Sequence, residues 1–334
     1  MEFDLPLIWA LLIATAVLLY VVLDGFDLGI GILFPFLTTD EQRDVAMNSV
    51  APVWDGNETW LVLGGGGLFA VFPLAYAVVM PAVYAPVTAM LLGLVFRGVA
   101  FEFRWKTVRW KRVWDWSFTL GSLAAAVSQG IILGALVQGI AVENRAYAGG
   151  WWDWLTPFSL LCGAAVAIGY ALLGATWLIM KTEADIRERA FSLARPAAVG
   201  TVVMVAVVSL WTPFLDPVFM ERWFTVPGLF WTAPVPILTG LTVLSLGVGL
   251  LRRNDLQPFL SAQALFVLCF LGLGISFYPN IIPPGLSIHE AAAPDESLSF
   301  LLVGTVVLLP IILAYTAYSY SVFRGKVRAG EGYH

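Results

Sequence analysis

Charged side chains are scarce in this chain: only 12% of its 334 residues are Asp, Glu, Lys or Arg, whereas 59% are hydrophobic. A water-soluble domain usually carries about twice that charged fraction, because polar groups must cover its surface. The composition therefore excludes an ordinary soluble globule and favours a protein that has the lipid bilayer as its solvent. The formal net charge of -5 says little about partners, because the charges are unevenly placed.

Metal-binding side chains are also few. The two histidines are His289 and His334, and neither lies in an apolar stretch, so we expect no histidine-ligated haem and no metal site on this chain. The two cysteines, Cys162 and Cys269, lie in separate apolar runs, and we expect buried thiols there. The sequence has no P-loop, dinucleotide fingerprint or nucleophile elbow, and nothing in it points to nucleic acid.

Long apolar segments are the main feature that is present. A membrane-spanning helix needs about 20 mostly apolar residues, and about nine segments qualify or nearly qualify. We predict an all-α polytopic membrane protein in which residues 1–334 form a single integral membrane domain. The acidic N-terminus lacks the basic region of a signal peptide, so the first span should be retained. The predicted spans are 7–37, 57–73 (short and rich in glycine), 76–101, 118–142, 155–180, 196–215, 229–251, 258–279 and 298–323.

Basic residues are concentrated in alternate connections between these segments. With nine spans, fifteen of the 18 Lys and Arg residues fall on one side of the membrane, and Arg145 and Arg222 fall on the other. Cytoplasmic loops carry an excess of Lys and Arg. We therefore predict a periplasmic N-terminus and a cytoplasmic C-terminus. An even number of spans would scatter the basic loops over both faces.

Two carboxylates, Asp24 and Asp27, lie late in the first span. Their i, i+3 spacing places both on one face of a helix. A charge at membrane depth costs at least about 2.5–3.5 kcal/mol, and two carboxyl groups this close should not both ionise easily. The pair is a candidate proton relay. The alternative is a static interhelical hydrogen bond or an ion pair with Arg97.

Asp55 opens the second span at its predicted cytoplasmic end, between Trp54 and Trp60. The helix dipole favours an ionised acid at this position. Such an acid could collect protons from the cytoplasm, or it could simply cap the helix. We expect the two tryptophans to act as interface anchors.

Arg97 is the deepest basic residue, near the cytoplasmic end of the third span. It requires a partner, and Asp24, Asp27 or Glu102 are the candidates for a polar cluster with it. A snorkelling arginine that reaches the interface is the alternative.

These motifs, taken together, give a specific resemblance over essentially the whole chain. The sequence resembles subunit II of cytochrome bd-type quinol oxidases, including the cyanide-insensitive branch. The motifs that carry the resemblance are residues 24–29 (DGFDLG), 48–57 (NSVAPVWDGN), 60–61 (WL), 96–104 (FRGVAFEFR) and 114–116 (WDW).

The resemblance implies an electrogenic complex in a bacterial inner membrane. In the family, subunit I binds haems b558, b595 and d, oxidises quinol and reduces dioxygen to water. Subunit II has no cofactor of its own except a structural quinone in some members, and it pairs with subunit I as a pseudosymmetric heterodimer. The family also implies two four-helix bundles plus one extra helix, contacts with lipids, and in some complexes a small accessory subunit.

The resemblance also implies roles for individual residues. Asp55 matches an aspartate on a cytoplasmic proton path, with Asp24, Asp27 and Arg97 as a neighbouring polar cluster. Trp60 matches a tryptophan near a proposed dioxygen access route. The pair Glu58-Thr59 differs from the Gln-Val pair of another branch, which leaves open whether Glu58 adds a protonatable site to the path.

Two other classes of function compete with an oxidase subunit. A proton-coupled secondary transporter could use Asp24 and Asp27 as its proton site, but transporters often repeat a broken-helix motif, and the chain shows no second copy of the first-span motif. A purely structural scaffold for a haem subunit would differ only in the kinetics of Asp55 variants.

Overall fold

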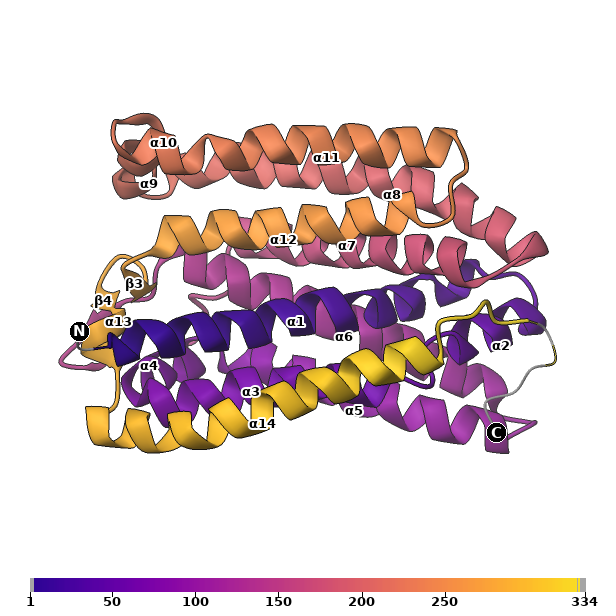
Figure 1. The fold of residues 1–334 in the computed structure, drawn as a ribbon, viewed down its shortest axis with the longest axis horizontal. Helices are drawn as coiled ribbons and strands as arrows, with labels where there is room; N and C mark the ends of the chain where they lie inside the picture. Colours follow the sequence, from indigo (N-terminus) through magenta and orange to yellow (C-terminus); the bar gives the residue numbers. More distant parts are fainter. Residues whose placement is uncertain (1–2, 329, 331–334) are drawn as a thin grey trace.

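Long helices that run side by side form the body of the protein (Figure 1). The structure is a computed structural model that describes residues 3–328 and 330, so Glu2 of the acidic N-terminus and His334 lie outside the described residues. The long helices are α1 (Leu5–Leu33), α3 (Trp54–Val71), α5 (Tyr84–Lys106), α6 (Lys111–Gln138), α7 (Pro157–Lys181), α8 (Ala184–Trp211), α11 (Pro234–Leu251), α12 (Gln257–Phe277) and α14 (Asp295–Val322).

Short elements join the long helices. The short helices are α2 (Asp40–Asn48), α4 (Pro73–Ala82), α9 (Pro217–Phe224), α10 (Gly228–Thr232) and α13 (Ile288–Ala291), with single 3-10 turns η1 (Phe34–Phe36) and η2 (Thr212–Phe214). Two small antiparallel hairpins pair β1 (Val142–Glu143) with β2 (Ala146–Tyr147) and β3 (Asn280–Ile282) with β4 (Leu286–Ser287). All four strands lie in connections between the long helices.

The helices have the length and composition of membrane spans. Within the described residues, eight helices are long and apolar enough to cross a bilayer, or nine if the bent pair α3 and α4 counts as one span. The prediction of an all-α polytopic membrane protein is confirmed. The start of α14 and the start of α1 lie at the same end of the bundle in Figure 1, and α14 runs from there to the opposite end.

One predicted span has the wrong boundary. The sequence pattern predicts a third span over residues 76–101, but residues 73–82 form α4, which is bent by 119° from α3, and a new helix begins only at Tyr84. Proline explains the break, because Pro86 has no backbone N–H to bond to the Ala82 carbonyl oxygen, and its ring would clash with that carbonyl in a continuous helix. Pro81 lies in the last turn of α4 and Pro86 in the first turn of α5.

Local sequence signals account for several helix starts. The Asp4 side chain accepts a hydrogen bond from the Leu7 backbone N–H at 3.1 Å and caps α1. Thr156 and Ser159 form a reciprocal capping box at the start of α7. These side chains satisfy backbone donors that the first turn of a helix leaves unpaired.

The core lies where α1 packs against α3, α6 and α7. Glycines on α1 and α7 permit a close backbone approach: a Cβ added at Gly29 would lie 1.8 Å from the Tyr170 carbonyl oxygen, and one at Gly174 would meet the Gly29 backbone. Phe26 stacks on Trp177 with 4.1 Å between ring centroids. The sequence segment 24–29 is therefore pressed directly against α7.

The glycine run of α3 is divided between two faces. Added Cβ atoms at Gly64 and Gly67 would meet Val17 and Ile13 of α1, whereas Gly65 and Gly66 have nothing within 4 Å. The run therefore allows close helix packing on the α1 side. The other face of α3 is open, and Val62 is 73% exposed there.

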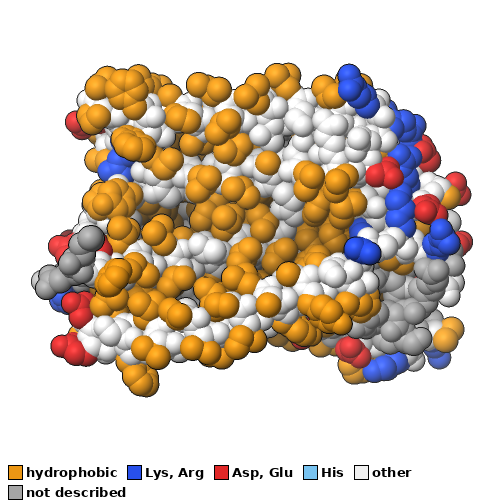
Figure 2. Space-filling view, viewed as in Figure 1, with side chains coloured by type: hydrophobic (Ala, Val, Ile, Leu, Met, Phe, Trp, Pro, Cys, Tyr) orange, Lys and Arg blue, Asp and Glu red, His pale blue; other side chains and the backbone are white. Residues whose placement is uncertain are grey.

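Charge is separated between the two ends of the bundle. Figure 2 shows hydrophobic side chains along the helices and most of the visible Lys and Arg side chains at the end where α8 begins and α11 ends. This arrangement agrees with the separation of basic loops in the sequence. By the positive-inside rule, that end is the one we predict to face the cytoplasm.

Candidate functional site

A buried arginine and three carboxyl groups meet between α1, α3 and α5. Arg97 lies 2.7 Å from Asp24, 3.2 Å from Glu58 and 3.9 Å from Asp27, measured between guanidinium nitrogens and carboxyl oxygens. The side chains of Arg97, Asp24 and Asp27 are 0% exposed, and that of Glu58 is 23% exposed. We call these four residues the Arg97 cluster. The predicted partnership of Arg97 with the first-span acids is present, and Arg97 does not snorkel.

The Arg97 cluster has more acids than bases. Three carboxyl groups face a single guanidinium, so full ionisation would leave two negative charges without a counter-charge. Burial makes an uncompensated charge costly. A group of carboxyls in this arrangement is therefore suited to hold and release protons.

Asn57 ties Asp27 to the rest of the bundle. Its amide nitrogen donates to Asp27 Oδ2 at 2.7 Å and to the Leu23 carbonyl oxygen at 3.3 Å. Its amide oxygen accepts a hydrogen bond from the Tyr320 hydroxyl at 2.9 Å. Asn57 is part of the 48–57 motif, but no sequence pattern connects it with Tyr320, which lies 263 residues further on.

Hydrogen bonds also join Tyr20, Gln129 and Tyr170 near Asp24. Gln129 donates to the Tyr20 hydroxyl at 2.8 Å and accepts from the Tyr170 hydroxyl at 2.7 Å. Tyr20 lies one helical turn before Asp24 on α1. The sequence feature that could have revealed these contacts is Gln129 itself, a polar residue within an apolar span. Such a side chain needs a hydrogen-bond partner in the bilayer.

Asp55 lies outside the Arg97 cluster but close to it along α3. It is exposed, in the first turn of α3, and Val53 rather than Asp55 is the capping residue. The alternative that Asp55 simply caps the helix is therefore not supported. Its spacing of three residues from Glu58 places the two carboxyls on one face of α3, so an exposed acid and a half-buried acid of the cluster are neighbours.

Two other predicted residues are placed differently from expectation. Glu102 is not part of the polar cluster: it is 59% exposed and pairs with Lys106 at 3.2 Å. The reason is helical geometry, because a residue five positions after Arg97 lies on a different face of the helix. Trp60 is not an interface anchor: it is 2% exposed and packs with Ala16 and Tyr20. Trp54, half-buried, stacks on Phe101 with 4.7 Å between ring centroids.

The described His, Cys, Asp and Glu side chains do not form a metal site. Among the residues that the structure describes, no group of three or more His, Cys, Asp and Glu side chains could hold a metal ion. His289 lies on α13, outside the long helices, with its ring nitrogen 3.1 Å from Asp4. Within the described part of the chain, the long helices therefore contain no histidine that could be an axial ligand of a haem.

These observations define a class: a polytopic helical membrane protein that carries a buried arginine–carboxylate cluster between its spans. Comparison with known proteins then identifies the family. Residues 5–323 match the family of cytochrome bd terminal oxidase subunit II, and the chain belongs to this family.

Individual relatives agree with this assignment over nearly the whole chain. Cytochrome bd-I ubiquinol oxidase subunit 2 of Escherichia coli (strain K12) is 31% identical, with 97% of this chain and 95% of that protein covered. Cytochrome bd ubiquinol oxidase subunit 2 of Bacillus subtilis (strain 168) is 30% identical, with 97% of each covered. The structure of bd oxidase from Geobacillus thermodenitrificans has a similar fold, with a TM-score of 0.78 at 19% identity over 96% of this chain and 99% of that one.

Membership of this family makes the chain a subunit of a quinol oxidase complex, and it implies a partner subunit I and haems within the complex. It also favours the oxidase-subunit hypothesis over the secondary-transporter alternative.

Proposed function

We propose that this chain is the non-haem subunit of a bacterial inner-membrane quinol oxidase and that it supplies a cytoplasmic proton path to its partner. The partner, subunit I, would bind haems b558, b595 and d, oxidise quinol and reduce dioxygen to water. The haems would supply the electron transfer and oxygen chemistry. The residues of this chain would hold and move protons.

The observation that carries the proposal is the position of Glu58. It lies three residues after the exposed Asp55 on α3, and its carboxyl oxygen is 3.2 Å from Arg97 in the buried cluster. Protons taken up at Asp55 would pass to Glu58 and then to Asp24 and Asp27. The proposed path therefore runs from the basic end of the protein into the bilayer.

The open face of α3 supports a destination outside this chain. Asp55 is exposed, and so are Thr59 and Val62 on later turns of the same helix. A partner subunit that covered this face would bury the path between the two chains. Consumption of these protons in water formation would make the complex electrogenic, and no complete active site is proposed on this chain alone.

The test is a pair of isosteric variants in the two-subunit complex. Asp55→Asn and Glu58→Gln remove a protonatable group and change little else, so both should slow quinol-dependent oxygen uptake about tenfold or more, as expected for loss of a proton-transfer group. Haem content and the KM for quinol should stay unchanged. Glu102→Gln is the matched control, because that exposed acid lies outside the cluster.

The turnover rates of Asp55→Asn and Glu58→Gln distinguish a proton path from a purely structural scaffold. If Asp55→Asn and Glu58→Gln turn over at the rate of the unchanged complex, the chain is a structural scaffold for the haem subunit and the proton path is wrong. If both are slow and Glu102→Gln is normal, the path stands.

Further roles implied by the family are proposals of the same kind. Trp60 would line a dioxygen access route, and a smaller side chain there would change the KM for oxygen. A structural quinone, lipids and a small accessory subunit would bind the assembled complex. The arrangement as two four-helix bundles plus one helix would mirror that of subunit I.

A further inference from the structure

α14 is held to the rest of the protein by few contacts. Only 6% of its most apolar window is buried, and Leu298, near its first turn, is its fully buried residue. Among the described side chains of α14, the Tyr320 hydroxyl makes the hydrogen bond that reaches another long helix, to Asn57 on α3. The last turn of this loosely packed helix thus contributes directly to the surroundings of Asp27.

The segment that follows α14 fastens its end. We call residues 323–328 the C-terminal strap. The Val327 backbone N–H donates to the Lys181 carbonyl oxygen at 2.8 Å. The Lys181 ammonium in turn donates to the carbonyl oxygens of Phe323 and of Gly325, the latter at 2.8 Å.

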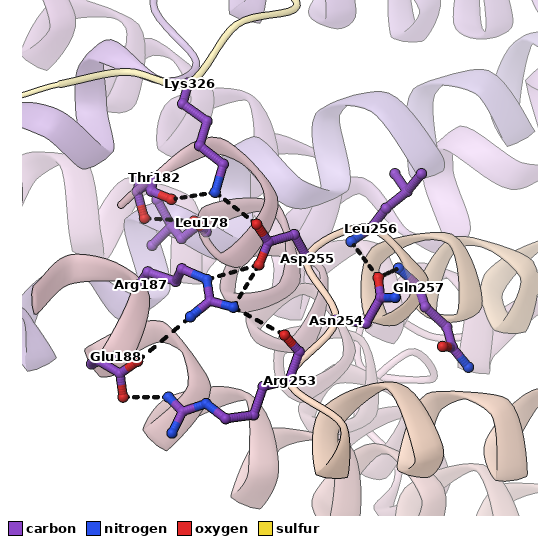
Figure 3. A network of polar contacts seen from close by, with 10 residues as sticks. All are labelled: Leu178, Thr182, Arg187, Glu188, Arg253, Asn254, Asp255, Leu256, Gln257 and Lys326. Atoms are coloured by element: carbon purple, nitrogen blue, oxygen red, sulfur yellow. Dashed lines mark hydrogen bonds and ion pairs between the residues drawn. The ribbon is translucent and has the colours of Figure 1, made fainter. Parts of the chain in front are cut away.

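A second lysine binds the strap to two other connections (Figure 3). Lys326 Nζ donates to Asp255 Oδ2 at 2.7 Å and to the Thr182 carbonyl oxygen at 3.1 Å. Arg187 holds the other carboxyl oxygen of Asp255 at 2.7 Å. Partial burial would raise the pKa of Asp255, but the hydrogen bonds from Lys326 and Arg187 outweigh it and hold that pKa below its usual value. The strap therefore ends in an ion-pair network that joins α7, α8 and the loop before α12.

Aromatic contacts connect the strap with the acidic motif. Lys181 Nζ lies 5.4 Å from the centroid of the Trp177 ring. That ring makes a T-shaped contact with Tyr320, with 6.4 Å between centroids, and it stacks on Phe26. Phe26 lies directly before Asp27 in the sequence, so Trp177 contacts Tyr320, the acidic motif and Lys181, the α7 lysine that binds the strap.

We propose that Tyr320, held in place by the C-terminal strap, is a positioning residue for the Arg97 cluster. Its hydroxyl satisfies the amide oxygen of Asn57 and so keeps both amide hydrogens directed at Asp27 and at the Leu23 carbonyl oxygen. Without that donor, the buried amide oxygen has no partner, and the amide loses the contact that holds its plane. The inference rests on the proposed function, because Asp27 affects turnover only if the cluster carries protons.

The test compares three variants of the purified two-subunit complex. Tyr320→Phe removes one hydroxyl and keeps the ring on Trp177. Tyr318→Phe is the matched control, because Tyr318 lies on the same helix with a side chain that is 67% exposed. Lys326→Met detaches the strap from Asp255 without touching the cluster.

Infrared difference spectroscopy gives the direct readout. Bands that disappear in Asp27→Asn report the Asp27 carboxyl group. Tyr320→Phe should shift these bands, and it should lower kcat about twofold to tenfold, as expected for one lost hydrogen bond, with the KM for quinol unchanged. Lys326→Met should shift the bands in the same direction and speed amide hydrogen exchange in the last turns of α14.

The inference is overturned if Tyr320→Phe leaves the Asp27 bands in place, or if Tyr318→Phe shifts them equally. The proposed function fails separately. If Asp55→Asn does not slow turnover while Tyr320→Phe shifts the bands, the proton path is wrong and the positioning role of Tyr320 still stands.

Discussion

Removal of the Arg97 guanidinium is the sharpest structural perturbation of the cluster. Arg97→Leu keeps an apolar side chain of useful size on α5 and deletes the single cation that faces Asp24, Asp27 and Glu58. The first two carboxyl groups are fully buried. Removing one partner of a buried ion pair costs about 3–5 kcal/mol, mainly because the remaining charge has no compensation. We expect a loss of this size in the stability of the assembled complex.

The assay is thermal unfolding of the detergent-solubilised complex, together with the yield of intact heterodimer. Lys106→Met is the matched control, since Lys106 and Glu102 are 71% and 59% exposed and a pair of this kind contributes about 0–1 kcal/mol. Adding Asp24→Asn to Arg97→Leu should restore part of the lost stability, because it removes one uncompensated buried charge.

Two results would refute this reasoning. One is an Arg97→Leu complex as stable as Lys106→Met. The other is a double variant less stable than Arg97→Leu alone, which would show that Asp24 does not depend on Arg97 for its counter-charge. We also expect assembly to suffer more than the turnover rate of the complexes that do form.

Two further predictions concern packing and the strap network. Gly29→Ala should destabilise the protein by about 2 kcal/mol or more, because the added Cβ would lie 1.8 Å from the Tyr170 carbonyl oxygen and force α1 away from α7. Gly247→Ala is the control, because a Cβ added there would have no neighbouring atom within 4 Å. It should be neutral or slightly stabilising in the same melting assay. Asp255→Asn should lower the free energy of unfolding at neutral pH by less than about 1 kcal/mol, because Asp255 is 40% exposed. The melting temperature should fall accordingly. Since its folded pKa is depressed, this stabilisation is present above the unfolded pKa and is lost as the pH falls through the folded value. The difference between Asp255→Asn and the unchanged protein should therefore vanish in acid, and a difference that persisted there would contradict an electrostatic origin.

Much of the site was predictable because charged residues within apolar membrane spans are easy to recognise in a sequence. Asp24, Asp27 and Arg97 stand out within apolar runs, and the cost of a buried charge requires that they find partners. The partnership of Arg97 with Asp24 and Asp27 could be anticipated for this reason. The choice between Glu58 and Glu102 as the third acid could not, because it depends on which face of each helix turns inward.

Residues distant in the sequence account for what was missed. Tyr320 and Gln129 contribute single polar groups whose partners lie 263 and 41 or more residues away. Nothing in their local sequence specifies those partners. The break before Tyr84 was missed for a different reason: the apolar run continues through it, and only Pro81 and Pro86 mark the break.

Composition and the spacing of apolar segments were enough to establish a helical membrane protein, because the cost of an unpaired backbone group in lipid leaves few other structures. The distribution of Lys and Arg predicted how the spans are oriented. The tertiary structure alone decided which acids share Arg97, that Trp60 is buried, and that the segment after α14 returns to bind Lys181 and Asp255. These features depend on how each helix is rotated about its own axis in the bundle. A one-dimensional pattern of polar and apolar residues does not specify that rotation.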